Sequence, residues 1–216
     1  VADAQPYAVT ETHPGAAQLA ELQQRLLQAQ RPVAIVGGSR WSEKAAGQFA
    51  DFAAAFSLPV YCSFRRQMLM SADHPCYAGD LGLGVNPKML ERIRNADLIL
   101  LAGGRLSEVP SQGYELLSIP QPKQALVHVH ADADELGKLY RPALGIHATP
   151  QAFAEAVSTL RPAQVPAWAA ETKTAREDFL RWSDPSPIRI PGALQMGEVM
   201  KHLREVLPAD TIFCNG

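Results

Sequence analysis

Three glycine-bearing segments of this sequence could bind a phosphate group. They are Gly37-Gly38-Ser39-Arg40, Gly103-Gly104-Arg105 and the segment 79–84, which carries three glycines including Gly82. Glycine lets a backbone approach a phosphate closely, and the arginines could each pair with a pyrophosphate. No segment is a G-x-G-x-x-G motif, so an equally weighted interpretation is that the glycines only make tight turns between strands and helices.

An acidic segment at 130–135 offers a second kind of contact. A carboxylate at this place in a nucleotide-binding fold can bind a ribose hydroxyl, which makes Asp132 a candidate. The alternative is that Asp132 or Asp134 caps a short helix, which we expect over 135–140.

The remaining polar residues indicate neither a catalytic centre nor a metal site. The six histidines show no metal spacing, and His128 and His130 share one strand face with no third ligand in view. The three cysteines, Cys62, Cys76 and Cys214, are odd in number and widely spaced. That pattern is typical of reduced thiols in a cytoplasmic protein.

Short apolar runs precede these segments and must position them. Runs of this kind that stop at glycines are typical of buried parallel strands. Such strands are predicted at 32–36, 58–62, 96–102, 125–130 and 145–148. Helical patterns alternate with them at 15–30, 42–56, 87–94 and 149–160, whereas 71–85 is predicted to be a long loop. The sequence therefore predicts an α/β fold with a doubly wound, mainly parallel sheet of about six strands flanked by helices. Ligands of such sheets bind beyond the carboxyl ends of the strands, where the glycines lie.

The composition argues against several classes of function. The chain has 216 residues, 47% of them hydrophobic, and a formal net charge of −2 without a basic patch, so we expect no nucleic-acid partner. No apolar run reaches the roughly 20 residues of a membrane span, and the start lacks the form of a signal peptide. We expect a cytoplasmic protein without a membrane partner; the absent initiating Met suggests a processed or excised chain.

The sequence also predicts an order of segments. Residues 1–14 are interpreted as an incoming linker and 15–162 as the main domain. Residues 163–191 are interpreted as a linker with an exposed helix, anchored by Trp168, Phe179 and Trp182. Residues 192–216 are interpreted as the start of another domain. That start is predicted to hold a helix near 194–207 and a strand at 211–214. One helix and one strand cannot bury both faces, so their partner elements are expected to be missing.

Taken in order, the segments 31–38, 58–60, 96–105, 127–132 and 135–138 resemble the Rossmann-like central domain of thiamine diphosphate-dependent enzymes. The resemblance covers about residues 15–162 and is specific as a set. It is strongest to the acetolactate synthase-like branch, which includes relatives of benzoylformate decarboxylase and pyruvate oxidase.

This resemblance implies a pyrimidine-binding domain before the chain and a truncated diphosphate-binding domain at 192–216. Thiamine diphosphate and Mg²⁺ would bind only in the full-length parent, a homodimer or homotetramer that makes or breaks a carbon–carbon bond in a 2-keto acid. The chain itself is expected to be inactive, without catalytic or metal-binding residues. The alternative is a stand-alone nucleotide- or flavin-binding module without catalysis.

Central domains of this family hold FAD, ADP or no nucleotide. Carried over by position, the residues that would line this site are Gly37, Gly38, Gly82, Gly103, Gly104, Arg105 and Asp132. The chain departs from the FAD-binding synthases at His130, where they tend to have an acid, and at Ser107-Glu108-Val109, where they carry a second arginine. A site for FAD, a site for another nucleotide and a purely structural cleft therefore stay open.

Overall fold

A six-stranded parallel sheet is the centre of the protein. The computed structural model describes residues 10–208 and 210–212, and the chain divides into two compact units, one up to Phe179 and one from Leu180 onward. The sheet lies in the first unit. Its strands are β1 (Pro32–Val36), β2 (Val60–Ser63), β3 (Tyr77–Leu81), β4 (Leu98–Ala102), β5 (Ala125–His130) and β6 (Leu144–His147).

The strand order, β3-β2-β1-β4-β5-β6, explains where a ligand could bind. The chain moves outward from β1 to β3, returns to place β4 beside β1, and then moves outward on the other side. All pairings are parallel, as expected from the buried apolar runs. The order therefore reverses between β1 and β4, and the first and third glycine segments follow these two strands.

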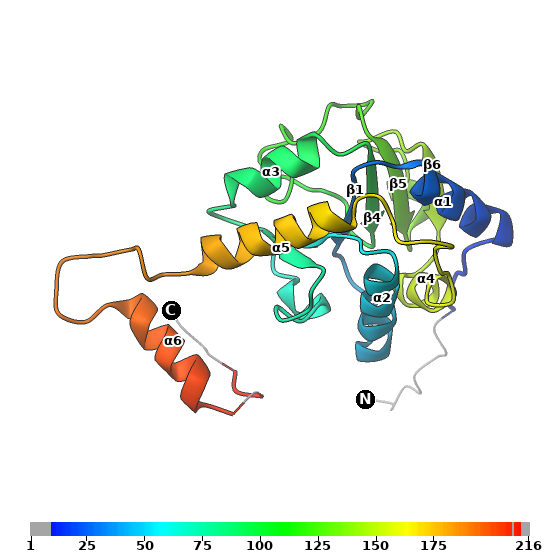
Figure 1. Cartoon of the computed structure of the whole chain (residues 1–216). Helices are drawn as coiled ribbons and strands as arrows, with labels where there is room; N and C mark the ends of the chain where they lie inside the picture. Colours follow the sequence, from blue (N-terminus) through cyan, green and yellow to red (C-terminus); the bar gives the residue numbers. More distant parts are fainter. Residues whose placement is uncertain (1–9, 209, 213–216) are drawn as a thin grey trace, which may run out of the picture. The chain divides into compact units, whose positions relative to one another are not determined.

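Helices cover both faces of the sheet (Figure 1). The helices of the first unit are α1 (Ala16–Gln28), α2 (Glu43–Ala55), α3 (Pro87–Arg94), α4 (Pro150–Val157) and most of α5 (Ala169–Ser183). The second unit contains α6 (Met196–Val206). Side-chain caps begin two of these helices: the Ser42 hydroxyl accepts from the amide of Ala45 at 3.1 Å, and Thr149 caps α4 with Pro150 in its first turn. These caps satisfy amides that have no partner inside their helices.

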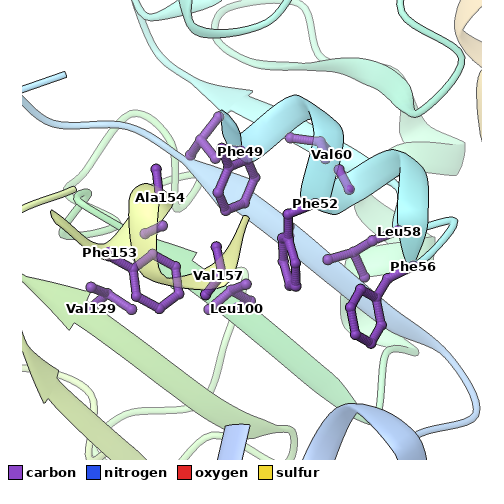
Figure 2. Packing of buried hydrophobic residues seen from close by; sticks show 14 of the residues in the cluster. Phe49, Phe52, Phe56, Leu58, Val60, Leu100, Val129, Phe153, Ala154 and Val157 are labelled. Carbon is purple, nitrogen blue, oxygen red and sulfur yellow. The ribbon is translucent and has the colours of Figure 1, made fainter. Parts of the chain in front are cut away.

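Two apolar layers hold the helices to the sheet. On one face, α1, α2 and α4 pack on alternate strand residues such as Ala34 and Leu100. Figure 2 shows the rings of Phe49, Phe52 and Phe56 along α2 and the ring of Phe153 from α4 in this layer. On the other face, α3 packs on the intervening strand residues. Because successive side chains of a strand point to opposite faces, both faces bury apolar groups, and the predicted doubly wound sheet is confirmed.

The structure corrects two of the predicted elements. Residues 77–81 form β3 inside the predicted long loop, because its pairing with β2 compensates for the weak strand pattern around Gly79 and Asp80. The helix expected over 135–140 is instead one 3₁₀ turn, Ala133–Glu135, and the chain adopts a φ of +84° at Gly137 soon after it.

The segment that forms α5 was expected to be an exposed linker helix, but the first part of this helix is packed against the core. Trp168 is buried beside it and donates from Nε1 to the carbonyl oxygen of Phe56 at 3.0 Å. Ala175 and Asp178 of the helix are buried as well, and Phe179 is packed against the core, whereas Trp182 is 54% exposed. The anchors Trp168 and Phe179 are therefore confirmed in the first unit.

The second unit contains the predicted helix near 194–207, which is α6. No residue of α6 is buried. The Asp184 carboxylate accepts from the Ser186 hydroxyl at 2.7 Å and pairs with Lys201 at 3.4 Å. Of the strand expected at 211–214, Thr211 and Ile212 are not in a strand, and the rest lies outside the described residues. None of the described helices is long and apolar enough to span a bilayer.

Candidate functional site

A pocket of about 360 Å³ lies at the carboxyl edge of the sheet, around the point where the strand order reverses. It is built by the loops that follow β1, β2, β4 and β5. Its lining residues are Gly38, Ser39, Ser63, Phe64, Arg66, Gly103, Gly104, Arg105, Leu106, Ser107, His130, Asp132 and Glu135. The structure therefore brings together Gly38, Gly103, Gly104, Arg105 and Asp132 from the set predicted from sequence.

Gly37 and Gly82 do not line the pocket, but each lies close to residues that do. A Cβ atom on Gly37 would lie 2.7 Å from the Cβ of Ser63, so Gly37 lets the loops after β1 and β2 approach each other. A Cβ atom on Gly82 would lie 3.5 Å from the ring of Phe64. Both glycines therefore support lining residues and do not contribute to the surface themselves.

The backbone of this edge adopts several left-handed conformations. Gly38 and Gly103 have φ angles of 72° and 78°, and Arg40, Arg65 and Leu106 also have positive φ, between 47° and 64°. Such conformations cost a non-glycine residue about 1 kcal/mol or more, and they concentrate at functional sites. Here the loops after β1, β2 and β4 all contain one.

The charges of the pocket come mainly from two arginines and two acids. Arg105 is 61% exposed, and its Nη1 lies 3.5 Å from Oε1 of Glu135. The same carboxylate accepts from Nζ of Lys138 at 2.9 Å, and this hydrogen bond is the main reason that the pKa of Glu135 is lowered. Glu135 thus holds the exposed Arg105 side chain near the opening, and Arg66 adds a second cation.

Arg40 was predicted to pair with a pyrophosphate, but it does not line the pocket. Its Nη2 donates to Glu11 at 2.7 Å and to the carbonyl oxygen of Thr10 at 3.3 Å. The second oxygen of Glu11 accepts from the hydroxyl of Thr149. These contacts, with that Thr149 hydrogen bond first among them, lower the pKa of Glu11. The segment at 10–12 is thereby fixed to the loops before α2 and α4.

Asp132 has the capping role weighed from the sequence. Its Oδ1 accepts from the amide of Asp134 at 3.0 Å and caps the 3₁₀ turn. The residue also lines the pocket, and its binding of a ribose hydroxyl stays a prediction. His130, where the FAD-binding synthases tend to have an acid, lies beside it and contacts the Asp132 backbone through Nδ1 at 3.0 Å.

His128 lies behind the pocket and is 3% exposed. Its Nε2 is 2.8 Å from the carbonyl oxygen of Gly104, and its ring centre is 5.8 Å from that of His130. Burial lowers the pKa of His128 to about 4, so the ring is neutral at pH 7 and donates from Nε2 to the carbonyl. Sequence reasoning placed His128 on a strand face but gave no signal of this contact.

Sequence reasoning also missed Ser63, Phe64 and Arg66. Their loop after β2 has no glycine motif, and the available signal was topological: β2 is the neighbour of β1, so its carboxyl end borders the same edge. The thiols contribute no nucleophile among the described residues. Cys62 and Cys76 are buried and unpaired, and burial raises their pKa values to about 12 and 11. Cys214 lies outside the described residues.

A larger cavity, of about 640 Å³, lies at the opposite, amino edge of the sheet between α3 and α5. Its charges neutralise one another: Arg92 pairs with Glu171 and Asp178, and Lys88 pairs with Asp178. The smaller pocket is the better candidate, because it combines glycine turns with a solvent-exposed arginine at the reversal of strand order.

Comparisons with known proteins agree with this architecture. The family model described as thiamine pyrophosphate enzyme, central domain, matches residues 19–157. Over 81% of the chain, the sequence is 29% identical to sulfoacetaldehyde acetyltransferase of Alcaligenes xylosoxydans xylosoxydans. Over 91% of the chain, it is 23% identical to the large subunit of acetolactate synthase isozyme 2 of Escherichia coli strain K12.

These matches cover 29% and 34% of the two relatives, so the chain spans about a third of their length. The crystal structure of benzoylformate decarboxylase from Polynucleobacter necessarius superposes with a TM-score of 0.57 at 17% identity, over 78% of this chain and 31% of that one. This likeness shows the same fold. With more than half of its residues matched by the family model, the chain belongs to the family of thiamine pyrophosphate enzyme central domains.

Proposed function

We propose that the chain is the central domain of a thiamine diphosphate-dependent enzyme and that its carboxyl-edge pocket binds the adenosine diphosphate moiety of a nucleotide. The observation that best supports this proposal is that the turns at Gly38 and Gly103 are in contact and line the pocket together with Arg105. Closely packed glycine turns let a diphosphate approach the backbone, and an exposed guanidinium can pair with its charge.

The lining residues fit such a ligand. Gly38, Gly103 and Gly104 would face the phosphates, Arg105 and Arg66 would offset their charge, and the free oxygen of Asp132 would accept from a ribose hydroxyl. ADP and FAD share this moiety. The volume of about 360 Å³ suits the moiety better than a whole dinucleotide, so ADP is the preferred ligand.

In the full-length parent, thiamine diphosphate with Mg²⁺ supplies the carbanion chemistry that makes or breaks a bond next to a carbonyl group. We assign no catalytic residue to this chain, whose part is to bind the nucleotide and to support neighbouring domains. Relatives named acetyltransferase and acetolactate synthase support a transferase acting on a 2-keto acid or an aldehyde. We further propose a homodimeric or homotetrameric parent in which 192–216 opens the diphosphate-binding domain.

Thermal unfolding with ADP, FAD, NAD and adenosine tests the nucleotide proposal. ADP at about 100 times its Kd should add about 2.7 kcal/mol and raise Tm by about 5 to 10 °C, whereas adenosine should have little effect. A yellow purified protein would identify FAD as the resident form. If neither ADP nor FAD changes Tm, the pocket is a structural cleft and the proposal is wrong.

The proposal for the parent is tested separately. The full-length protein that carries this segment should consume pyruvate or another 2-keto acid only when thiamine diphosphate and Mg²⁺ are present. Consumption without thiamine diphosphate, or binding of thiamine diphosphate by the present chain alone, would contradict it.

A further inference from the structure

The contact between His128 and Gly104 joins the core to the loop that lines the pocket. His128 is a buried residue of β5, and Gly104 follows β4, the neighbouring strand. The distance of 2.8 Å from Nε2 to the carbonyl oxygen is that of a good hydrogen bond. This contact therefore fixes the direction of the Gly104 carbonyl.

That direction determines where the next amide points. In a planar trans peptide the C=O and N–H bonds point in opposite directions. Because the Gly104 carbonyl points toward the buried His128 ring, the amide of Arg105 points away from it. Gly104 and Arg105 both line the pocket, and within residues 10–208 and 210–212 the Arg105 amide donates to no backbone carbonyl. The amide is thus free to bind a ligand.

The peptide needs such a restraint because of the residues that form it. Gly103 adopts a φ of 78°, and Gly104 has no side chain to limit its rotation. A peptide that follows two glycines has more rotational freedom than any other, so it can turn its carbonyl toward the pocket. A carbonyl oxygen there would repel a phosphate.

We propose that His128 is a positioning residue that locks the Gly104–Arg105 peptide, so that the Arg105 amide donates to a phosphate of the nucleotide. This inference rests on the proposed nucleotide function. The lock holds at neutral pH, because a carbonyl oxygen only accepts and the ring at 2.8 Å from it therefore carries a proton on Nε2. The groups that face the ring are the Gly104 carbonyl, the His130 ring and, further away, the Glu135 carboxylate.

Two substitutions separate the lock from ordinary packing. His128→Gln keeps an N–H donor at the position of Nε2, and His128→Leu keeps the bulk without the donor. His74→Leu is the matched control, because His74 contacts the backbone amide of Cys76 in a loop away from the pocket. The carbonyl carbon resonance of Gly104 reports the hydrogen bond without any ligand.

Calorimetric titration with ADP and with adenosine, well below Tm, completes the test. The loss of one hydrogen bond to a charged group should weaken ADP binding about tenfold in His128→Leu and leave adenosine binding unchanged. His128→Gln and His74→Leu should bind ADP within about twofold of the wild type. The Gly104 carbonyl resonance should move further in His128→Leu than in His128→Gln, and His74→Leu should leave it unchanged.

Equal ADP affinity in the wild type and His128→Leu would overturn the lock while leaving the nucleotide proposal intact. An unmoved Gly104 resonance in His128→Leu would also overturn it. If the wild type itself binds no ADP or FAD, the proposed function fails, and the role of His128 in ligand affinity fails with it.

Discussion

The carbonyl oxygen of Gly103 lies 1.8 Å from the position that a Cβ atom on Gly38 would occupy. The turns after β1 and β4 therefore touch through their backbones, and no side chain fits between them. Gly38 also has a φ of 72°, so both its conformation and its surroundings demand glycine. This contact shapes one wall of the pocket.

Gly38→Ala should lower the free energy of unfolding by about 3 kcal/mol or more, since it adds backbone strain to a clash with a carbonyl group. Gly47→Ala is the matched control, because Gly47 is exposed in α2 with nothing within 4 Å of an added Cβ. That change should stabilise the protein by about 0.5 to 1 kcal/mol. Urea unfolding measures both. A Gly38→Ala protein as stable as the wild type would contradict the close approach.

The buried His128 predicts a loss of stability in acid. Its pKa is about 4 in the folded protein, below its ordinary 6.5, so between these values the unfolded chain binds the extra proton. The stabilisation is therefore complete above about pH 6.5 and is lost as the pH falls toward 4, by about 3 kcal/mol in all. The free energy of unfolding, measured from pH 7 to pH 4, should fall more steeply in the wild type than in His128→Gln. Parallel pH profiles would show that the ring is not buried as described.

Arg92 should hold α5 against α3. It donates to Glu171 at 2.5 Å and to the buried Asp178 at 2.9 Å. Arg92→Met removes one of the cations that pair with the buried Asp178, leaves the ion pair with Lys88 in place, and should cost about 2 to 4 kcal/mol. Faster amide hydrogen exchange in α5 should accompany the loss. Arg94→Met, an exposed change on the same helix, should stay within about 0.5 kcal/mol of the wild type.

Arg105 and Arg40 should differ in their effect on ADP binding. Arg105→Ala removes an exposed guanidinium from the pocket and should weaken ADP binding about tenfold, with a smaller dependence on salt. Arg40→Ala should leave the affinity within about twofold, because Arg40 is held by Glu11 outside the pocket. Calorimetric titration of both variants with ADP at two salt concentrations measures these affinities. A larger effect of Arg40→Ala than of Arg105→Ala would contradict the proposed contact of Arg105 with the phosphates.

Much of the fold could be predicted because its signals are local. The runs that became β1 and β4 are apolar throughout, since parallel strands are buried on both faces, and Ser42 and Thr149 have the chemistry of caps. β3 was missed because its stability comes from pairing with β2, and Gly79 and Asp80 interrupt the pattern that would have revealed it. A helix longer than the actual turn at Ala133–Glu135 was predicted, because the sequence beyond the turn has a helical pattern until Gly137.

The site was predictable only where a residue type carries its own signal. Gly38 and Gly103 stand out because few other residues readily adopt the positive φ angles of their turns. Phe64, Arg66 and the contact of His128 with Gly104 depend on which strands are neighbours, and that order is a property of the whole sheet. The partner of Arg105, Glu135, likewise comes from the loop after another strand.

Backbone amide shifts recorded by NMR during titration with ADP test the central claim most directly, because they show whether the nucleotide binds and where. Saturable shifts should gather on Gly38, Gly103, Gly104 and Arg105, and Arg31 and Asn95 at the amino-edge cavity should stay unchanged. The account would be contradicted if only residues of the amino-edge cavity shifted. It would also be contradicted if neither millimolar ADP nor FAD caused any amide shift.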